Sequence, residues 1–239
     1  MPKLHFCAQY SSEYEALKLG LPTSSNFHAL FTKPSKKFPK GQPSTQWKHL
    51  AHHLIAERLL KRPVETFTSY HMERGLEMEP EAVAWYEWET GVETQLIGFI
   101  TTDDGKAGCS PDRLIGEDGL LEIKCPTPTG QVDYLLDPDA AHKHWPQLQG
   151  QLLVSGRRWV DLLAWHRHLQ RRVVRVERDE EYIGQLDWQL RLLNQYIDGV
   201  MSRLWWISEQ GPPPQADRPE GAPVDSPPAV DDAFGVSHA

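Results

Sequence analysis

Three residues near the middle of the chain have the types and spacing of a metal-dependent phosphodiesterase centre. Asp112 follows Ser-Pro, and Glu122 and Lys124 flank one isoleucine in the later run LLEIKC. A carboxylate pair suits Mg²⁺ or Mn²⁺, which prefer hard oxygen ligands and keep water and substrate phosphate in their remaining positions. The metal lowers the pKa of a bound water, and an ammonium group stabilises charge that develops on the phosphate. The pattern therefore predicts hydrolysis of phosphodiester bonds.

These side chains can act together only if the chain between them folds back on itself. The runs DRLIG and LLEIKC flank the turn residues Glu-Asp-Gly at 117–119, which predicts a β-hairpin. Alternate side chains of a strand share a face, so Glu122 and Lys124 point the same way, with Asp112 across from them. The apolar alternates point into the opposite layer: Leu121, Ile123 and Cys125. The competing interpretation is a surface hairpin with an ordinary Glu–Lys pair.

The sequence around this hairpin alternates between helical and extended patterns. Apolar residues at helical spacing predict helices over 11–21, 24–31, 45–62, 74–90, 142–156 and 179–207. Apolar runs predict strands over 92–102, 158–166 and 171–179 in addition to the hairpin. Ser24 or Ser25 is a candidate N-cap for the second helix, and Pro80 marks a first turn or a kink. We therefore expect an α/β fold, a central mixed β-sheet flanked by helices.

Composition indicates one folded domain and a tail. Residues 1–210 are long enough to enclose a single core, whereas 211–239 is rich in Pro, Ala and Asp and is predicted to be a disordered tail. The tail holds five acids and one base, so half of the net charge of −8 lies there. An acidic balance does not exclude a DNA substrate, because a divalent-cation site itself needs clustered carboxylates.

Several other classes of protein are disfavoured. No apolar run reaches the length of a membrane span, and the start of the chain resembles no signal peptide, so we expect no membrane partner and no export. The three cysteines are too scattered for a disulfide framework or a zinc site, which fits a reducing cytoplasm. No phosphate-binding glycine loop for ATP occurs.

Histidines and tryptophans carry weaker signals. Three histidine pairs lack further ligands at zinc spacing and are interpreted as surface residues: His52 and His53, His142 and His144, His166 and His168. Trp205 and Trp206 are interpreted as core or subunit contacts, with base stacking as the alternative.

The run GCSPDRLIGEDGLLEIKCPTP resembles the PD-(D/E)xK core of the YqaJ-like, phage lambda-type alkaline exonucleases. Four further blocks resemble that family in matching order: LKLGLPTSSNFHALFTKPSKK, RGLEMEPEAVAWYEWETGV, WPQLQGQLLVSG and VVRVERDEEYI. The five blocks extend over residues 14–200. The resemblance implies a restriction-endonuclease-like core and a nuclease domain over residues 1–210.

The resemblance also implies the ligands of the metal. These are Asp112, Glu122, the backbone carbonyl of Ile123, and Glu79. Lys124 would be the catalytic lysine. Glu79 matches the helix glutamate that completes the family's metal site. Considered alone, Glu79 would be one of three solvated acids with Glu77 and Glu81.

The resemblance of the same sequence blocks also implies an active-site glutamine and a set of phosphate-binding residues. Gln147 matches the family's active-site glutamine; Gln147 and Gln151 share a helix face, with Gln149 turned away, and Gln147 is favoured. The implied 5′-phosphate and DNA-binding residues are Lys18, Thr23, Ser25, Lys33, Lys36 and Lys37. Lys18 stands where the family has arginine, so it offers a point charge instead of a bidentate fork. Thr23 and Ser25 are alternatively helix caps.

The resemblance specifies the reaction further. It implies a Mg²⁺-dependent exonuclease, with Mn²⁺ as the alternative ion, that digests one strand of duplex DNA from its 5′ end to 5′-mononucleotides. It also implies a homotrimeric ring, a single-strand annealing protein as partner, and a phage or prophage gene expressed in a bacterial cytoplasm. The alternatives are a structure-specific endonuclease, a 3′-end trimmer, and a nuclease-fold subunit that binds DNA without cleaving it.

Overall fold

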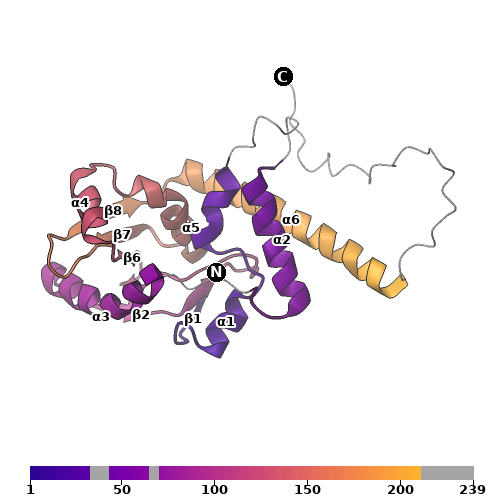
Figure 1. Cartoon of the computed structure of the whole chain (residues 1–239), viewed down its shortest axis with the longest axis horizontal. Helices are drawn as coiled ribbons and strands as arrows, with labels where there is room; N and C mark the ends of the chain where they lie inside the picture. The colour runs from indigo at the N-terminus through magenta and orange to yellow at the C-terminus, as the bar shows by residue number, and fades with distance from the viewer. Residues whose placement is uncertain (33–42, 65–69, 211–239) are drawn as a thin grey trace, which may run out of the picture.

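Two β-sheets and the helices packed on them form the computed structural model, which describes residues 1–32, 43–64 and 70–210 (Figure 1). The predicted tail and the loop lysines Lys33, Lys36 and Lys37 lie outside these ranges. In chain order the elements are β1 (Lys3–His5), α1 (Ser12–Lys18), η1 (Ser24–Phe31), α2 (Thr45–Leu60), α3 (Tyr70–Thr90), β2 (Thr94–Leu96), β3 (Phe99–Thr101), β4 (Gly108–Cys109), β5 (Arg113–Ile115), β6 (Gly119–Lys124), α4 (Pro128–Leu136), η2 (His142–His144), α5 (Trp145–Ser155), β7 (Trp159–Ala164), β8 (Arg172–Glu177) and α6 (Glu180–Gln210).

The larger sheet has the strand order β2-β5-β6-β7-β8. β6 pairs antiparallel with β5, which confirms the predicted hairpin, and parallel with β7, where Glu122 lies opposite Leu162. The other two pairings in this sheet are antiparallel. A parallel pair needs a long crossover, and α4, η2 and α5 supply it. The expected mixed sheet of an α/β fold is therefore confirmed.

The smaller sheet has the order β1-β3-β4 and corrects one predicted element. The single strand expected over 92–102 is wrong, because β2 joins the larger sheet and β3 the smaller one. Gly98 lies between them, and a Cβ atom there would approach Cys7 O to 2.2 Å. The chain changes sheet where only glycine allows that close contact between backbones. β1 has three residues and was too short to predict.

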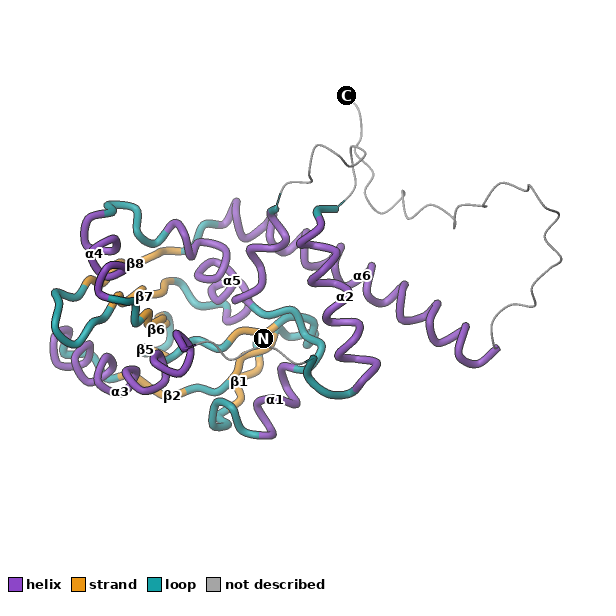
Figure 2. The backbone as a smooth tube through the Cα atoms, viewed as in Figure 1, coloured by secondary structure: helices purple, strands orange, loops and turns teal. Residues whose placement is uncertain are grey.

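The two faces of the larger sheet carry different helices. Leu114, Leu120 and Leu162 belong to the main core, together with buried residues of α2, α5 and α6. The alternate positions Leu121 and Leu163 pack instead against α3. Figure 2 shows the strands lying between α3 and α5. Glu122 and Lys124 share the face of Leu120, so the sequence alternation directs them toward α5.

Two predicted helix starts are corrected. Residues 24–31 form a 3₁₀-helix, whose N-cap is Thr23 rather than Ser24 or Ser25, and Thr23 makes no capping hydrogen bond. The first-turn interpretation of Pro80 is wrong, since α3 begins at Tyr70 and continues through the proline. A proline inside a helix removes one backbone hydrogen bond. Burial of Ala82 and Tyr86 against the sheet offsets that loss.

Two observations concern residues outside the sheets. No helix in the described part of the chain is long and apolar enough to cross a membrane. α4 was not predicted; it starts at the N-cap Thr127, whose side chain accepts from the Gly130 N–H.

The contact between α5 and η1 yields a stability prediction. A Cβ atom at Gly150 would lie 2.4 Å from the ring of Phe27, which is fully buried. Gly150→Ala should lower the free energy of unfolding by about 1–3 kcal/mol through overpacking, despite the gain of up to about 1 kcal/mol in helix propensity. Urea denaturation measures the change. The control is Gly184→Ala in α6, where nothing within 4 Å would meet the methyl group and stability should rise. Equal gains in both variants would contradict the tight contact.

Candidate active site

The predicted carboxylates meet at the end of β6. Asp112 precedes β5, and its N–H donates to Leu121 O at 3.1 Å. The Asp112 carboxylate in turn accepts from the Ile123 N–H at 2.5 Å. Glu122 lies one residue before Ile123 and is 4% exposed. Backbone pairing in the hairpin thus places both carboxylates at one edge of the sheet, as the sequence predicted.

Three side chains donate hydrogen bonds to the buried Glu122 carboxylate. Lys124 Nζ and Gln147 Nε2 both reach Oε1, at 2.6 and 2.7 Å. Gln151 Nε2 reaches Oε2 at 2.6 Å. Lys124 also donates to Gln147 Oε1 at 3.1 Å. The predicted common face of Gln147 and Gln151 is confirmed, and both glutamines contact the same carboxylate.

The charges of this group influence one another strongly. Burial, together with the nearby Glu122 and Glu79 carboxylates, raises the pKa of Asp112 well above its usual range. For Lys124, burial acts to lower the pKa, but the charge and hydrogen bond of Glu122 outweigh it and the pKa rises. Lys124 is therefore an ammonium group at neutral pH. The acids together carry more negative charge than Lys124 can balance.

Glu79 approaches the hairpin from α3, through a residue that the sequence did not single out. Arg113 Nη1 donates to Glu79 Oε1 at 2.6 Å and to Asp112 O at 2.6 Å. The Glu79 side chain is 19% exposed, so it is not one of the freely solvated acids of α3. In the sequence, the only sign that Arg113 belongs to the site is its place in a predicted strand directly after Asp112.

The residues present fit a hard divalent cation. The Lys124 carbonyl points toward β7, where it accepts from the Trp165 N–H. Backbone groups of neighbouring residues in a strand point to opposite sides, so the N–H and carbonyl of Ile123 point to the side of β6 on which Asp112 lies. Within the ranges that the structure describes, no three acidic, imidazole or thiolate groups already form a ligand cluster. The donor set is nevertheless all oxygen, and the raised pKa of Asp112 marks a place where added positive charge would stabilise the site.

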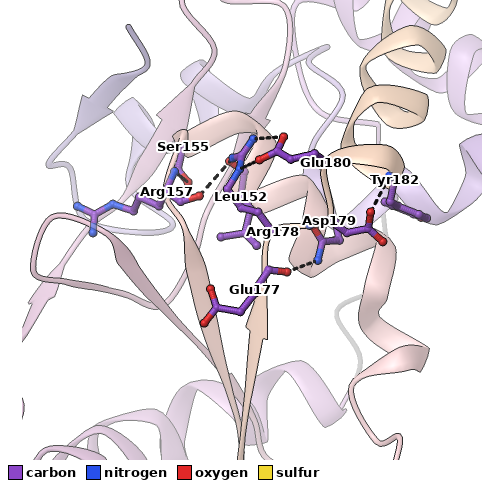
Figure 3. A network of polar contacts seen from close by, with 9 residues as sticks. Leu152, Ser155, Arg157, Glu177, Arg178, Asp179, Glu180 and Tyr182 are labelled. Carbon is purple, nitrogen blue, oxygen red and sulfur yellow. Dashed lines mark hydrogen bonds and ion pairs between the residues drawn. The ribbon is translucent and has the colours of Figure 1, made fainter.

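A separate polar network fixes the orientation of α5. Gln149, on the face turned away from Glu122, donates to Glu177 O at 2.8 Å and accepts from the Asp179 N–H at 2.9 Å. Arg178 donates to Leu152 O at 2.5 Å, near the end of the helix (Figure 3). These contacts tie α5 to the end of β8. The helix therefore presents Gln147 and Gln151 to Glu122 in a fixed rotation.

Two further residues lie near Lys124 and were not predicted. Tyr134 Oη and His144 Nε2 are hydrogen-bonded at 2.6 Å. Burial, followed by the charges of Lys124 and Lys143, lowers the pKa of His144 to about 4, so this imidazole is neutral at physiological pH. Burial raises the pKa of Tyr134 to about 12. The pair forms an uncharged wall beside the ammonium group. Nothing in the spacing of these two residues indicated a contact.

A pocket of about 570 Å³ between α1, η1 and α2 collects the predicted phosphate-binding residues. Lys18, Thr23 and Ser25 line it, and Thr23 Oγ1 lies 3.1 Å from Ser25 Oγ. Tyr10 also lines it and extends toward the acids: burial, Tyr14, and the charges of Asp112 and Glu79 raise the pKa of Tyr10. Gln9, the residue before Tyr10, donates to Pro111 O at 3.5 Å, so the Tyr10 side of the pocket lies near Asp112.

The structure does not place the other predicted candidates among the residues that surround Glu122. The three lysines of the 33–42 segment and the side chains of Trp205 and Trp206 lie outside what the structure describes. The surface interpretation of His166 is wrong, because its side chain is buried. It is buried because Gln131 holds the surrounding loop against α4, donating to Ala164 O and Gln170 O.

The family model for the YqaJ-like viral recombinase domain matches residues 13–158. The chain belongs to this family. The matched YqaJ-like segment runs from α1 through α5 and includes the hairpin, both glutamines and the pocket residues Lys18, Thr23 and Ser25. No curated protein sequence matches the chain.

Solved structures of exonucleases share the fold. An alkaline exonuclease, LHK-Exo from Laribacter hongkongensis, is 26% identical, with a TM-score of 0.73 over 84% of this chain and 99% of that one. Its complex with dAMP aligns equally well. A phage-related exonuclease from Haemophilus somnus 129PT is 15% identical, with a TM-score of 0.61 over 80% of this chain and 99% of that one, and shows the fold alone. Family and neighbours together support a phage-type exonuclease for this YqaJ-like protein.

The Glu122 contacts yield a second prediction. Gln151→Leu removes the sole donor to Glu122 Oε2 within the described residues, leaving a buried charged oxygen without a partner. The free energy of unfolding should fall by about 1.5–3 kcal/mol. Urea denaturation of chelator-treated protein measures it. Gln195→Leu, at an exposed position of α6, serves as the control and should stay within about 0.5 kcal/mol of wild type. An equally small effect at both positions would contradict the role of Gln151.

Proposed function

We propose that this YqaJ-like protein is a Mg²⁺-dependent 5′-to-3′ exonuclease acting on linear double-stranded DNA. It would degrade one strand to 5′-mononucleotides and leave a 3′ overhang for phage-type single-strand annealing recombination. The observation that carries the proposal is the buried Glu122 carboxylate beside Asp112, with Lys124 and Gln147 hydrogen-bonded to it. Support for an end-directed reaction comes from the adjacent pocket, which contains a lysine and two hydroxyl groups.

The cation would be held by Asp112, Glu122 and the Ile123 carbonyl, with Glu79 completing the set. When bound, Mg²⁺ lowers the pKa of a coordinated water and neutralises charge on the phosphate. Mn²⁺ has the same preference for oxygen ligands and is the alternative ion. Glu79 pairs with Arg113 through Oε1, which leaves Oε2 to bind the ion.

The protein's own groups position the reactants. The oxygen of water forms a bond to phosphorus while the bond from phosphorus to the 3′ oxygen breaks, giving a 5′-phosphate and a 3′-hydroxyl. The Lys124 ammonium stabilises the negative charge that accumulates on the phosphate oxygens. The amide of Gln147, already 2.7 Å from Glu122, holds that carboxylate in place and presents a second polar group to the water. Tyr134 and His144, hydrogen-bonded to each other and both neutral, add no competing charge near Lys124.

The pocket explains how cleavage would repeat. Each cut leaves a new 5′-phosphate on the strand, and Lys18, Thr23 and Ser25 are chemically suited to hold that group. One neighbouring alkaline exonuclease has been crystallised with dAMP, which fits release of mononucleotides. The proposal also includes a homotrimeric ring, an annealing protein as partner and action in a bacterial cytoplasm, all inferred from the family. Sedimentation of the purified protein tests the trimer.

The first activity prediction concerns Lys124. Lys124→Ala should reduce the rate of nucleotide release from end-labelled linear duplex by about 10²-fold or more, because charge on the phosphate loses its stabilising partner. Lys106→Ala, which removes an exposed lysine paired with Asp198, is the control and should retain the wild-type rate. Wild type without Mg²⁺ should be inactive.

The same assay separates the alternatives. Cutting of closed circular DNA would identify an endonuclease, and release of label from the 3′ end first would identify a 3′-end trimmer. If wild type with Mg²⁺ degrades no linear DNA while Lys124→Ala binds DNA equally well, the protein is a binding subunit.

A second activity prediction concerns the end of the strand. Wild type should digest 5′-phosphorylated duplex faster than 5′-hydroxyl duplex, and Lys18→Ala should reduce that preference about tenfold, since a charged hydrogen bond contributes about 1.5–3 kcal/mol. Lys18→Arg should increase the preference, because a guanidinium binds phosphate through two donors. The ratio of kcat/KM for the two substrates measures it. Equal ratios in all three proteins would show that Lys18 does not contact the phosphate.

A further inference from the structure

The loop 165–171, between β7 and β8, begins directly beside the candidate active site. β7 runs parallel to β6, and Trp165 N donates to Lys124 O at 2.9 Å. The loop therefore leaves the sheet at the edge where Glu122 and Lys124 lie. In Figure 1 β7 and β8 lie above β6 and α3 lies below it, whereas α1 and α2, which line the phosphate pocket, lie to the right of these elements.

Contacts of Gln131 and the burial of Trp165 hold the loop in shape. Gln131 of α4 is fully buried and donates to Ala164 O at 3.1 Å and to Gln170 O at 2.7 Å, closing the two ends of the loop. Trp165 is 2% exposed and anchors the first residue. Arg167 and His168 are exposed on the outer surface. Because the backbone is already fixed, binding through these side chains costs little ordering of the chain.

Cationic groups from two elements gather at this loop. Burial and the charges of Arg74, His168 and Arg171 all lower the pKa of His166, which places these three groups around it. Burial and the charge of Asp112 raise the pKa of Cys125, the residue after Lys124, to about 11, and the charge of Arg74 opposes that rise. Arg74 is therefore close enough to both the loop and the catalytic hairpin for its charge to act on each.

The guanidinium groups of Arg167 and Arg171 can donate further hydrogen bonds. The Arg171 guanidinium lies 5.7 and 5.9 Å from the rings of Trp85 and Trp165 and donates to Arg167 O. Its Nε is buried and has no acceptor within the described ranges, and neither Arg171 nor Arg74 forms an ion pair there. Arg167 pairs with Glu81, and both side chains are about half exposed. An exposed pair of this kind is weak and can exchange its carboxylate for another anion.

We propose that the loop 165–171, with Arg74 of α3, binds the phosphodiester backbone of the DNA substrate beside the catalytic hairpin, at a surface separate from the Lys18 pocket. The proposal rests on the proposed function for the identity of its ligand. Guanidinium groups match the geometry of phosphate oxygens and are the side chains best suited to this contact. A duplex end held at the pocket would then have a second contact with the protein near the catalytic hairpin, and Glu81 would compete with DNA for Arg167.

The test measures binding of fluorescent linear duplex in the Lys124→Ala background without divalent cation, over a series of salt concentrations. Arg167→Ala should weaken binding about three- to tenfold and reduce the slope of log affinity against log salt by about one. Glu81→Gln should tighten binding about threefold, because it releases Arg167 from its competitor. The control Arg191→Ala removes an exposed arginine paired with Asp187 on α6 and should leave both quantities unchanged.

The outcomes are distinguishable. Unchanged affinity and salt slope in both Arg167→Ala and Glu81→Gln would overturn the proposal, even if the wild type digests DNA. The predicted pattern in a protein that cuts no DNA with Mg²⁺ would support the surface and refute the nuclease. Thermal unfolding of each variant identifies loss of fold, and Arg167→Lys, which keeps the charge, should retain most of the salt slope if DNA is the ligand.

Discussion

A carboxylate buried to 4% exposure is costly unless it is compensated, and Glu122 imposes that requirement on the rest of the structure. Its donors come from β6 itself and from α5, so the sheet and the helix must keep a fixed distance and rotation. Gly150 permits the close approach of α5 to η1, and Gln149 and Arg178 prevent α5 from turning. Packing contacts far from Glu122 therefore help to place the hydrogen-bond donors that its carboxylate needs.

The parallel pairing of β6 and β7 is the second constraint, and it organises the surroundings of the site. A parallel pair places the ends of both strands at one edge, so the catalytic hairpin and the loop 165–171 lie together although distant in sequence. The crossover between these strands contains α4 and α5. The same segment therefore supplies the glutamines that contact Glu122 and Gln131, which holds the loop.

Local patterns predicted the hairpin and the helix face of Gln147 and Gln151, because periods of two and of three to four residues are properties of the chain itself. The proximity of Glu79 to Asp112 was available only from family resemblance, since it depends on how α3 packs against the sheet. Arg113 and the Tyr134–His144 pair could not be predicted, because tertiary contacts over long sequence separations bring them to the site. His166 was misassigned for the same reason: a polar residue in a loop is usually exposed unless another element covers it.

Arg113 gives the acid cluster an internal counter-ion, since it binds Glu79 and the backbone carbonyl of Asp112 at once. Lys124 does the same for Glu122. A centre that carries its own cations does not depend on a metal ion to hold its fold together, in contrast to small zinc domains, whose stability is the metal's binding energy. Under the proposed Mg²⁺ dependence, chelation would therefore give a folded, inactive protein, and restoring the cation would reactivate it without refolding. Metal supply would then control when cutting begins, independently of how the protein is made.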